Sequence, residues 1–67
     1  MEKAYFFIRK ADSGAVERIF SGAGVKLCLC PCYDEPETVL VSFYSTPSEQ
    51  KFLMGRLVDS CISFEAV

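Results

Sequence analysis

The stretch Val25-Lys26-Leu27-Cys28-Leu29-Cys30-Pro31-Cys32-Tyr33 decides how this chain folds. Aliphatic residues and cysteines alternate along it with a period of two, which is the period of a β-strand. Pro31 cannot donate a hydrogen bond to a neighbouring strand, so it predicts that this strand lies at an edge of its sheet. One face of the strand carries Val25, Leu27 and Leu29. The opposite face carries Cys28, Cys30 and Cys32.

A strand and a helix are expected before that stretch. Ala4–Arg9 is aromatic and β-branched, which favours a strand. Apolar residues then recur at helical spacing from Ala15 to Ala23, and either Asp12 or Ser13 is the expected N-cap. The predicted helix is short, about ten residues long.

A strand, a helix and a last strand are expected after it. Thr38–Ser45 predicts a strand that forms a hairpin with the central stretch across the acidic turn Asp34–Glu37. Thr46-Pro47-Ser48-Glu49 combines an N-cap, a proline in the first turn and a capping-box glutamate. Ile62–Val67 alternates as a final strand. The expected apolar stripe of the second helix is Leu53, Met54, Leu57 and Val58, with Cys61 near its end.

The order β-α-β-β-α-β in a single domain, residues 1–67, predicts an α+β fold of the ferredoxin-like split β-α-β-β-α-β type. Such a sandwich has a four-stranded antiparallel sheet in the order 4-1-3-2, with two helices on one face. The second strand is then an edge strand, as Pro31 independently indicates.

Composition and charge exclude several classes of protein. Hydrophobic residues make up 51% of the chain, too many for a disordered segment. The net charge is −2 and no basic run is present, which argues against binding to nucleic acid or to anionic membranes. No window resembles a membrane span, and Met1–Tyr5 lacks the apolar region of a signal peptide. We therefore expect a cytoplasmic protein whose thiols stay reduced.

The face of the sheet away from the helices is expected to be open and half apolar. A mixed aromatic, aliphatic and thiol surface of this kind usually marks a contact with a protein partner or a second copy, so a homodimer is expected. The residues predicted to form this interaction face are Tyr5, Phe7, Lys26, Leu40 and Tyr44.

The cysteines have three interpretations. Cys28, Cys30 and Cys32 are small apolar strand residues, reactive thiols or metal ligands. Sulfurs at a spacing of two along a strand diverge, and Cys61 lies near the opposite edge, so no metal site is predicted. Cys32 beside the turn is expected to be the most accessible of the three.

The chain contains few of the side chains that enzymes usually use for catalysis. The chain contains no histidine, so neither a Cys–His nor a Ser–His pair can form, and we expect neither enzyme activity nor a cofactor. RNA-recognition domains share this order of elements, but Glu37–Tyr44 lacks the basic residue and the glycine of their third strand.

With these elements in place, the chain resembles a family of small selenium/sulfur carrier-like bacterial proteins. The similar parts are Ala15–Glu17, Ala23–Leu27, Leu29 with Pro31, and Phe43. The resemblance implies the same order of strands and helices and a thiol that carries sulfur or selenium. The family has a Cys-Gly pair where this chain has Glu37-Thr38, so a carrier thiol here would have to be Cys30 or Cys32.

The sequence thus favours a small, non-enzymatic accessory or binding module that acts through its open sheet face and edge strand. Its most specific form is a thiol-based carrier or sensor. The alternative is a homo-oligomeric regulatory or protein-interaction module, including a phage-type inhibitor, whose cysteines are inert.

Overall fold

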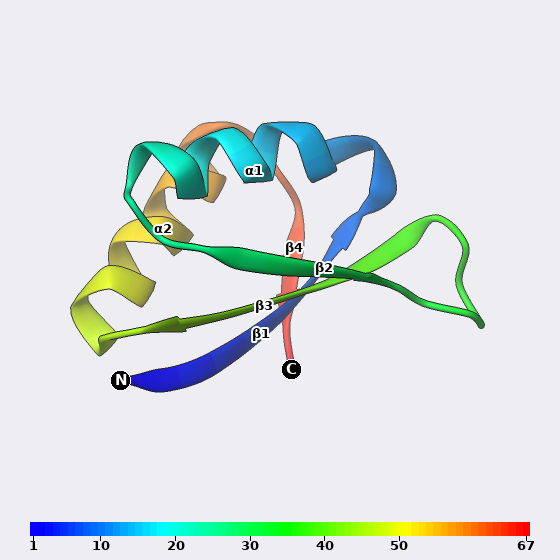
Figure 1. The fold of residues 1–67 in the computed structure, drawn as a ribbon. Helices are drawn as coiled ribbons and strands as arrows, with labels where there is room; N and C mark the ends of the chain where they lie inside the picture. The colour runs from blue at the N-terminus through cyan, green and yellow to red at the C-terminus, as the bar shows by residue number, and fades with distance from the viewer.

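A computed structural model describes all residues, 1–67, as a sheet with two helices (Figure 1). The expected order of strands and helices is confirmed, and only a short 3-10 turn at Lys10–Asp12 is added to it. No helix is both long and apolar enough to cross a membrane. The elements are β1 (Glu2–Arg9), α1 (Ser13–Gly22), β2 (Leu27–Pro31), β3 (Thr38–Ser45), α2 (Pro47–Asp59) and β4 (Phe64–Ala66).

The four strands form one antiparallel sheet in the order β2-β3-β1-β4, which confirms the predicted order and the edge position of β2. The long strands β1 and β3 pair along their whole length, from Glu2 opposite Ser45 to Arg9 opposite Thr38. Both helices lie on one side of the sheet, and the β2–β3 connection projects beyond its end (Figure 1). The other face of the sheet is therefore left without a covering layer.

The hydrophobic core lies between the helices and the sheet. A chain of aromatic rings crosses it: the Phe20 ring of α1 lies 4.7 Å from Phe43, and Phe6 lies 5.5 Å from Phe43 and 5.2 Å from Phe64. Leu27 and Leu29 pack against this core while remaining partly exposed. The buried core residues are Ala4, Phe6, Ile8, Val16, Phe20, Val25, Val39, Val41, Phe43, Leu53, Leu57 and Ile62.

The apolar stripe of α2 is narrower than predicted. Leu53 and Leu57 are fully buried, Met54 is half-buried, and Val58 is 62% exposed, so its assignment to the stripe is wrong. Residues on an α-helix are separated by about 100°, which places Val58 about 120° from the line midway between Leu53 and Leu57. A helix lying on a sheet buries only the side chains nearest that line.

The two helix N-termini differ. At α2 the predicted capping box is present: the Thr46 hydroxyl accepts from the Glu49 N–H at 3.2 Å, and the Glu49 carboxylate accepts from the Thr46 N–H at 2.9 Å. At α1 the N-cap position belongs to Asp12, but its side chain makes no capping bond. Its carboxylate instead accepts a hydrogen bond from Arg9 Nε at 3.1 Å, which ties the end of β1 to the following turn.

Two strands begin later than predicted because the helices before them end in Schellman motifs. After α1, the Val25 N–H bonds the Phe20 carbonyl and the Gly24 N–H bonds the Ser21 carbonyl. The N–H of Val25, the first residue of the predicted strand Val25–Tyr33, thus bonds the end of the helix and not a neighbouring strand. β2 consequently begins only at Leu27.

The same motif delays β4. After α2, the Ile62 N–H bonds the Leu57 carbonyl, and the Cys61 N–H bonds the Val58 carbonyl. The residue that must adopt the left-handed conformation is Gly24 after α1, with φ +73°, but Cys61 after α2, with φ +57°. β4 consequently covers Phe64–Ala66 rather than Ile62–Val67.

Cys61→Gly is expected to stabilise the protein, because glycine adopts positive φ without the steric cost that a Cβ imposes. That cost is about 1 kcal/mol, so the midpoint of thermal unfolding should rise by roughly 4–8 °C. Gly24→Ala is the matched control and should lower the midpoint by a similar amount; no atom crowds a Cβ at that position, so only backbone strain acts. Unfolding followed by circular dichroism measures both shifts, and a lower midpoint for Cys61→Gly would contradict the assignment of the motif.

Candidate functional site

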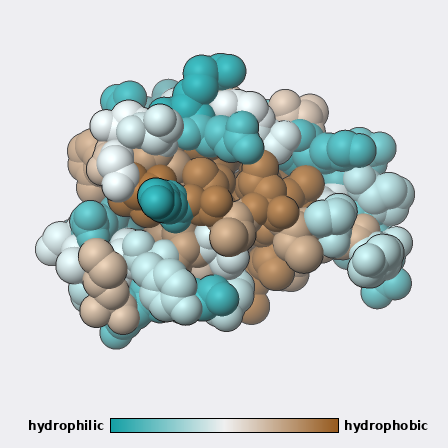
Figure 2. Space-filling model, viewed as in Figure 1, coloured by the Kyte–Doolittle hydropathy of each residue, from teal (hydrophilic) through white to brown (hydrophobic).

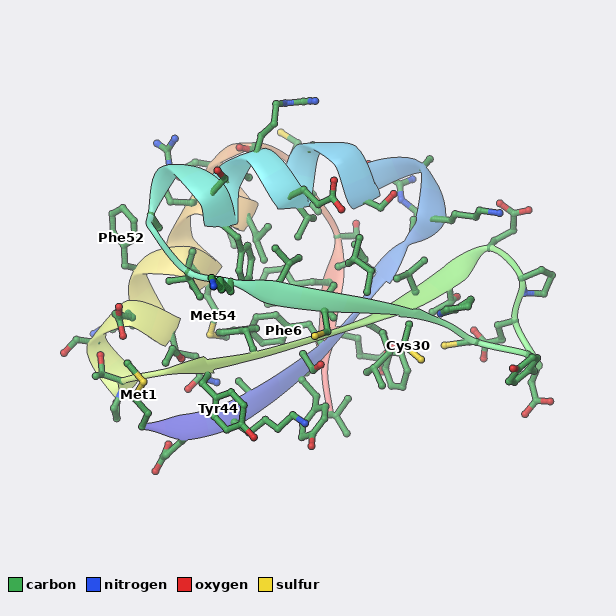
Figure 3. The ribbon with its side chains drawn as sticks, viewed as in Figure 1. Met1, Phe6, Cys30, Tyr44, Phe52 and Met54 are labelled. Atoms are coloured by element: carbon green, nitrogen blue, oxygen red, sulfur yellow. The ribbon has the colours of Figure 1, made fainter.

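The candidate site is the open face of the sheet, the face away from the helices. Strand alternation and the pairing registers place every second residue of each strand on it. In Figure 3, Cys30 and Tyr44 lie on this side. The open face is made up of Lys3, Tyr5, Phe7 and Arg9 of β1, Cys28 and Cys30 of β2, Thr38, Leu40, Ser42 and Tyr44 of β3, and Glu65 of β4.

The middle of the open face is a row of four directly paired residues, one from each strand. Cys30 lies opposite Leu40, Leu40 opposite Phe7, and Phe7 opposite Glu65. Phe7 and Leu40 are half-buried although no helix covers them, because they shield one another across the strands. The row therefore presents an apolar centre with a thiol at one end and a carboxylate at the other.

Two tyrosines and a lysine extend this apolar centre toward the start of β1. Tyr5 is 40% and Tyr44 60% exposed. The Lys3 Nζ lies 5.5 Å from the centroid of each ring, a cation–π arrangement that holds both rings and brings a positive charge beside them. Lys3 was not among the predicted residues because the strand was expected to begin at Ala4. Lys3 is two residues from Tyr5, and this spacing would have placed it on the same face of the strand.

Lys26 was predicted to lie on the open face, but the structure places it just outside that face. It is exposed and precedes β2, whose first residue is Leu27. It thus flanks the open face instead of standing in a strand of it. The interaction role of the predicted set Tyr5, Phe7, Lys26, Leu40 and Tyr44 stays a prediction.

A depression of about 900 Å³ adjoins the apolar centre at the end nearest the β2–β3 connection. Phe7 and Cys30 lie on its wall, together with Arg9 and the carboxylates of Glu35 and Glu65. Its size is in the range of small-molecule sites, and its wall combines apolar, thiol and both kinds of charged group.

The four cysteines are all free thiols, and they divide into two places. Cys28 and Cys30 are exposed on the open face, whereas Cys32 is only partly exposed. The expectation that Cys32 is the most accessible of the three is therefore wrong. The chain turns there: the Cys32 N–H bonds the Thr38 carbonyl at 3.4 Å, which closes the hairpin and partly covers the residue.

Cys61 lies apart from the other three cysteines. It follows α2 and precedes β4, at the edge of the sheet opposite to β2. No group of three or more histidine, cysteine or acidic side chains is placed to hold a metal ion. Two polar side chains on the wall of the depression bond to each other: the Thr38 hydroxyl donates to the Glu35 carboxylate at 3.0 Å within the turn.

No protein-family model, curated protein or solved structure matches this chain.

Proposed function

We propose that this protein is a small, non-enzymatic binding module of the ferredoxin-like type, and that the open face of its sheet is the binding surface. The observation that supports this most is the uncovered apolar centre formed by Phe7 and Leu40, with exposed Tyr44 beside it. Apolar surface of this kind gains free energy when another molecule removes it from water. The partner that suits it is a second copy or another protein, in the cytoplasm, where disulfides are rare and transient.

The chemistry of the face favours binding over catalysis. Apolar and aromatic side chains fill its centre, and charged groups stand at its margins, which is how protein interfaces are arranged. Lys3 and Arg9 lie at opposite ends of β1, and Glu65 lies on β4. Charges at the margin steer and orient a partner and contribute little to its affinity.

The exposed thiols support a more specific form of the same function. Cys28 and Cys30 stand at the side of the binding face, where a partner would reach both. A thiol-based carrier or sensor of sulfur or selenium, as in the family that the sequence resembles, would use Cys30. Both Cys30 and Cys32 line the depression, but Cys30 is exposed and Cys32 is only partly exposed. The alternative is a homo-oligomeric regulatory module with inert cysteines, which the same face would serve equally well.

An anionic aromatic dye, 8-anilinonaphthalene-1-sulfonate, tests the binding face without knowledge of the partner. We expect the dye to fluoresce on the native protein, because its rings match the apolar centre and its sulfonate matches Lys3. Tyr44→Ser should remove most of this fluorescence. Phe52→Ser is the matched control, since Phe52 is 58% exposed, much like Tyr44, but lies on α2. Equal losses in the two variants, or no fluorescence with the native protein, would contradict the proposal.

A further inference from the structure

The outer edge of β2 has unpaired backbone groups. The Cys32 N–H points toward β3, where it bonds the Thr38 carbonyl. Because backbone groups alternate in an antiparallel strand, those of Cys28 and Cys30 point the same way. The backbone groups of the alternate residues, Leu27, Leu29 and Pro31, point outward, where no strand lies. The outward groups are the N–H and C=O of Leu27 and Leu29 and the C=O of Pro31.

Apolar side chains flank these unpaired groups on both sides. Leu27 and Leu29 are partly exposed toward the helices, and Cys28 and Cys30 are exposed toward the open face. Figure 2 shows hydrophobic residues gathered along the middle of the molecule, over β2. An edge strand with unpaired donors and apolar flanks is suited to pair with another strand.

The charges at the ends of β2 indicate which strand would pair with its outer edge. Lys26 precedes the strand, and Asp34 and Glu35 follow it, all exposed. A second copy that pairs antiparallel brings its acidic end beside the basic end of the first, and this happens twice in a symmetric dimer. The strand is thus complementary in charge to its own antiparallel copy.

We propose that β2 pairs with β2 of a second copy in one register, with Leu29 opposite Leu29, and that oxidation locks this pair through Cys28 and Cys30. β2 spans Leu27–Pro31, so only the register centred on Leu29 pairs the whole strand. In it, two Leu29 residues exchange two hydrogen bonds, and each Leu27 N–H reaches the Pro31 carbonyl of the other copy. Pro31, which has no N–H, then stands at the end of the ladder, where its missing bond costs least.

This register places Cys28 directly opposite Cys30 of the second copy, on the same face. The two form a non-hydrogen-bonded pair, in which the Cα atoms are about 4.5 Å apart, within the range that a disulfide spans. The two-fold axis creates the pair twice. Within one chain, by contrast, Cys28 and Cys30 are two residues apart on a strand, near the limit of that range.

The locking step is thiol–disulfide exchange with a low-molecular-weight disulfide. The Cys28 thiolate attacks that disulfide, forms a mixed disulfide and releases one small thiol. The Cys30 thiolate of the second copy then attacks the Cys28 sulfur and releases the other small thiol. Each cross-link thus consumes two protein thiols and one small disulfide, and it yields one protein disulfide and two small thiols.

The small size of the paired edge is the reason that a lock matters. A five-residue strand is about 17 Å long and its edge about 10 Å high, so pairing covers on the order of 200 Å² per copy. A stable interface covers about 800 Å² per partner. Pairing through the edge alone is therefore transient until a covalent bond holds it. Pairing through the β2 edge leaves the open face uncovered. The dimer and the binding role of the open face can therefore be tested independently.

The experiment uses the full chain with Cys32→Ser and Cys61→Ser, so that Cys28 and Cys30 are its only thiols. Oxidised glutathione is added to this parent, to its Cys28→Ser and Cys30→Ser derivatives, and to an equal mixture of the two derivatives. Intact mass under non-reducing conditions is the readout. We expect the parent to reach twice the chain mass, neither derivative to do so alone, and the mixture to regain the dimer through one Cys28–Cys30 bond.

Each other outcome overturns part or all of the proposal. A dimer of the Cys30→Ser derivative alone would mean that Cys28 faces Cys28, which contradicts the register. Dimers of both derivatives to the same extent as the mixture would indicate random collision of exposed thiols. A parent that stays monomeric, with its thiols joined within one chain or to glutathione, would show that the edges do not pair.

Discussion

Phe43→Ala should leave the protein largely unfolded at room temperature. Phe43 is 2% exposed, and its ring contacts Phe20 of α1 and Phe6 of β1, so it joins a helix to the two central strands. Truncating a buried phenylalanine costs about 3–5 kcal/mol, and each lost aromatic pair adds roughly 0.5–1.5 kcal/mol. A domain of 67 residues has a total stability of only about 3–10 kcal/mol.

Urea unfolding followed by far-UV circular dichroism measures this loss. Phe52→Ala is the control, because it makes the same chemical change on an exposed side chain of α2 and should alter stability by no more than about 0.5 kcal/mol. If Phe43→Ala unfolded cooperatively with a loss below about 1 kcal/mol, the position of Phe43 in the core would be wrong.

Leu29→Asp is expected to destabilise the protein strongly, and Cys30→Asp only weakly. The two residues are neighbours on β2, but Leu29 packs against the core and Cys30 is exposed on the open face. Aspartate disfavours a strand at either position, so the difference between the variants isolates the cost of placing a carboxylate against the core. We expect that difference to be about 2 kcal/mol, or roughly 10 °C in the midpoint of thermal unfolding.

Thermal unfolding at pH 7, above the ordinary pKa of aspartate, measures both variants. Equal losses in the two would mean that neither face of β2 is more buried than the other. A larger loss for Cys30→Asp would invert the assignment of the faces.

The fold could be predicted because its signals are local. Alternation in Thr38–Ser45 sorts its residues between the core and the open face, and Pro31 marks an edge strand. Thr46 and Glu49 form the capping box that their spacing indicates. Each of these signals depends on backbone chemistry within a few residues, which no distant contact overrides.

The starts of β2 and β4 could not be predicted, because alternation alone does not show where a helix-ending motif stops and a strand begins. The hydrogen bonds of the two Schellman motifs involve the first residues of each alternating stretch, and one motif uses Cys61 where glycine is usual. The partial cover of Cys32 likewise comes from closure of the hairpin. Val58 is apolar and was therefore predicted to lie in the core. It is exposed because α2 is rotated about its axis so that Leu53 and Leu57, and not Val58, face the sheet.

The candidate site was predictable in position but not in chemistry. Alternation alone places Tyr5, Phe7 and Tyr44 together on the open face. A binding surface needs no fixed spacing of residues, unlike a catalytic triad or a zinc site, so no motif identifies what it binds. The depression beside Cys30 arises from the arrangement of residues on all four strands, which no single segment reveals.

The most direct test of the open face as the binding surface is a chemical-shift map of the amide groups during titration with 8-anilinonaphthalene-1-sulfonate. We expect the largest shifts at Phe7, Leu40 and Tyr44, with Phe52 and the rest of α2 unmoved. Shifts that cluster on α2, with the open face unmoved, would contradict the proposed function.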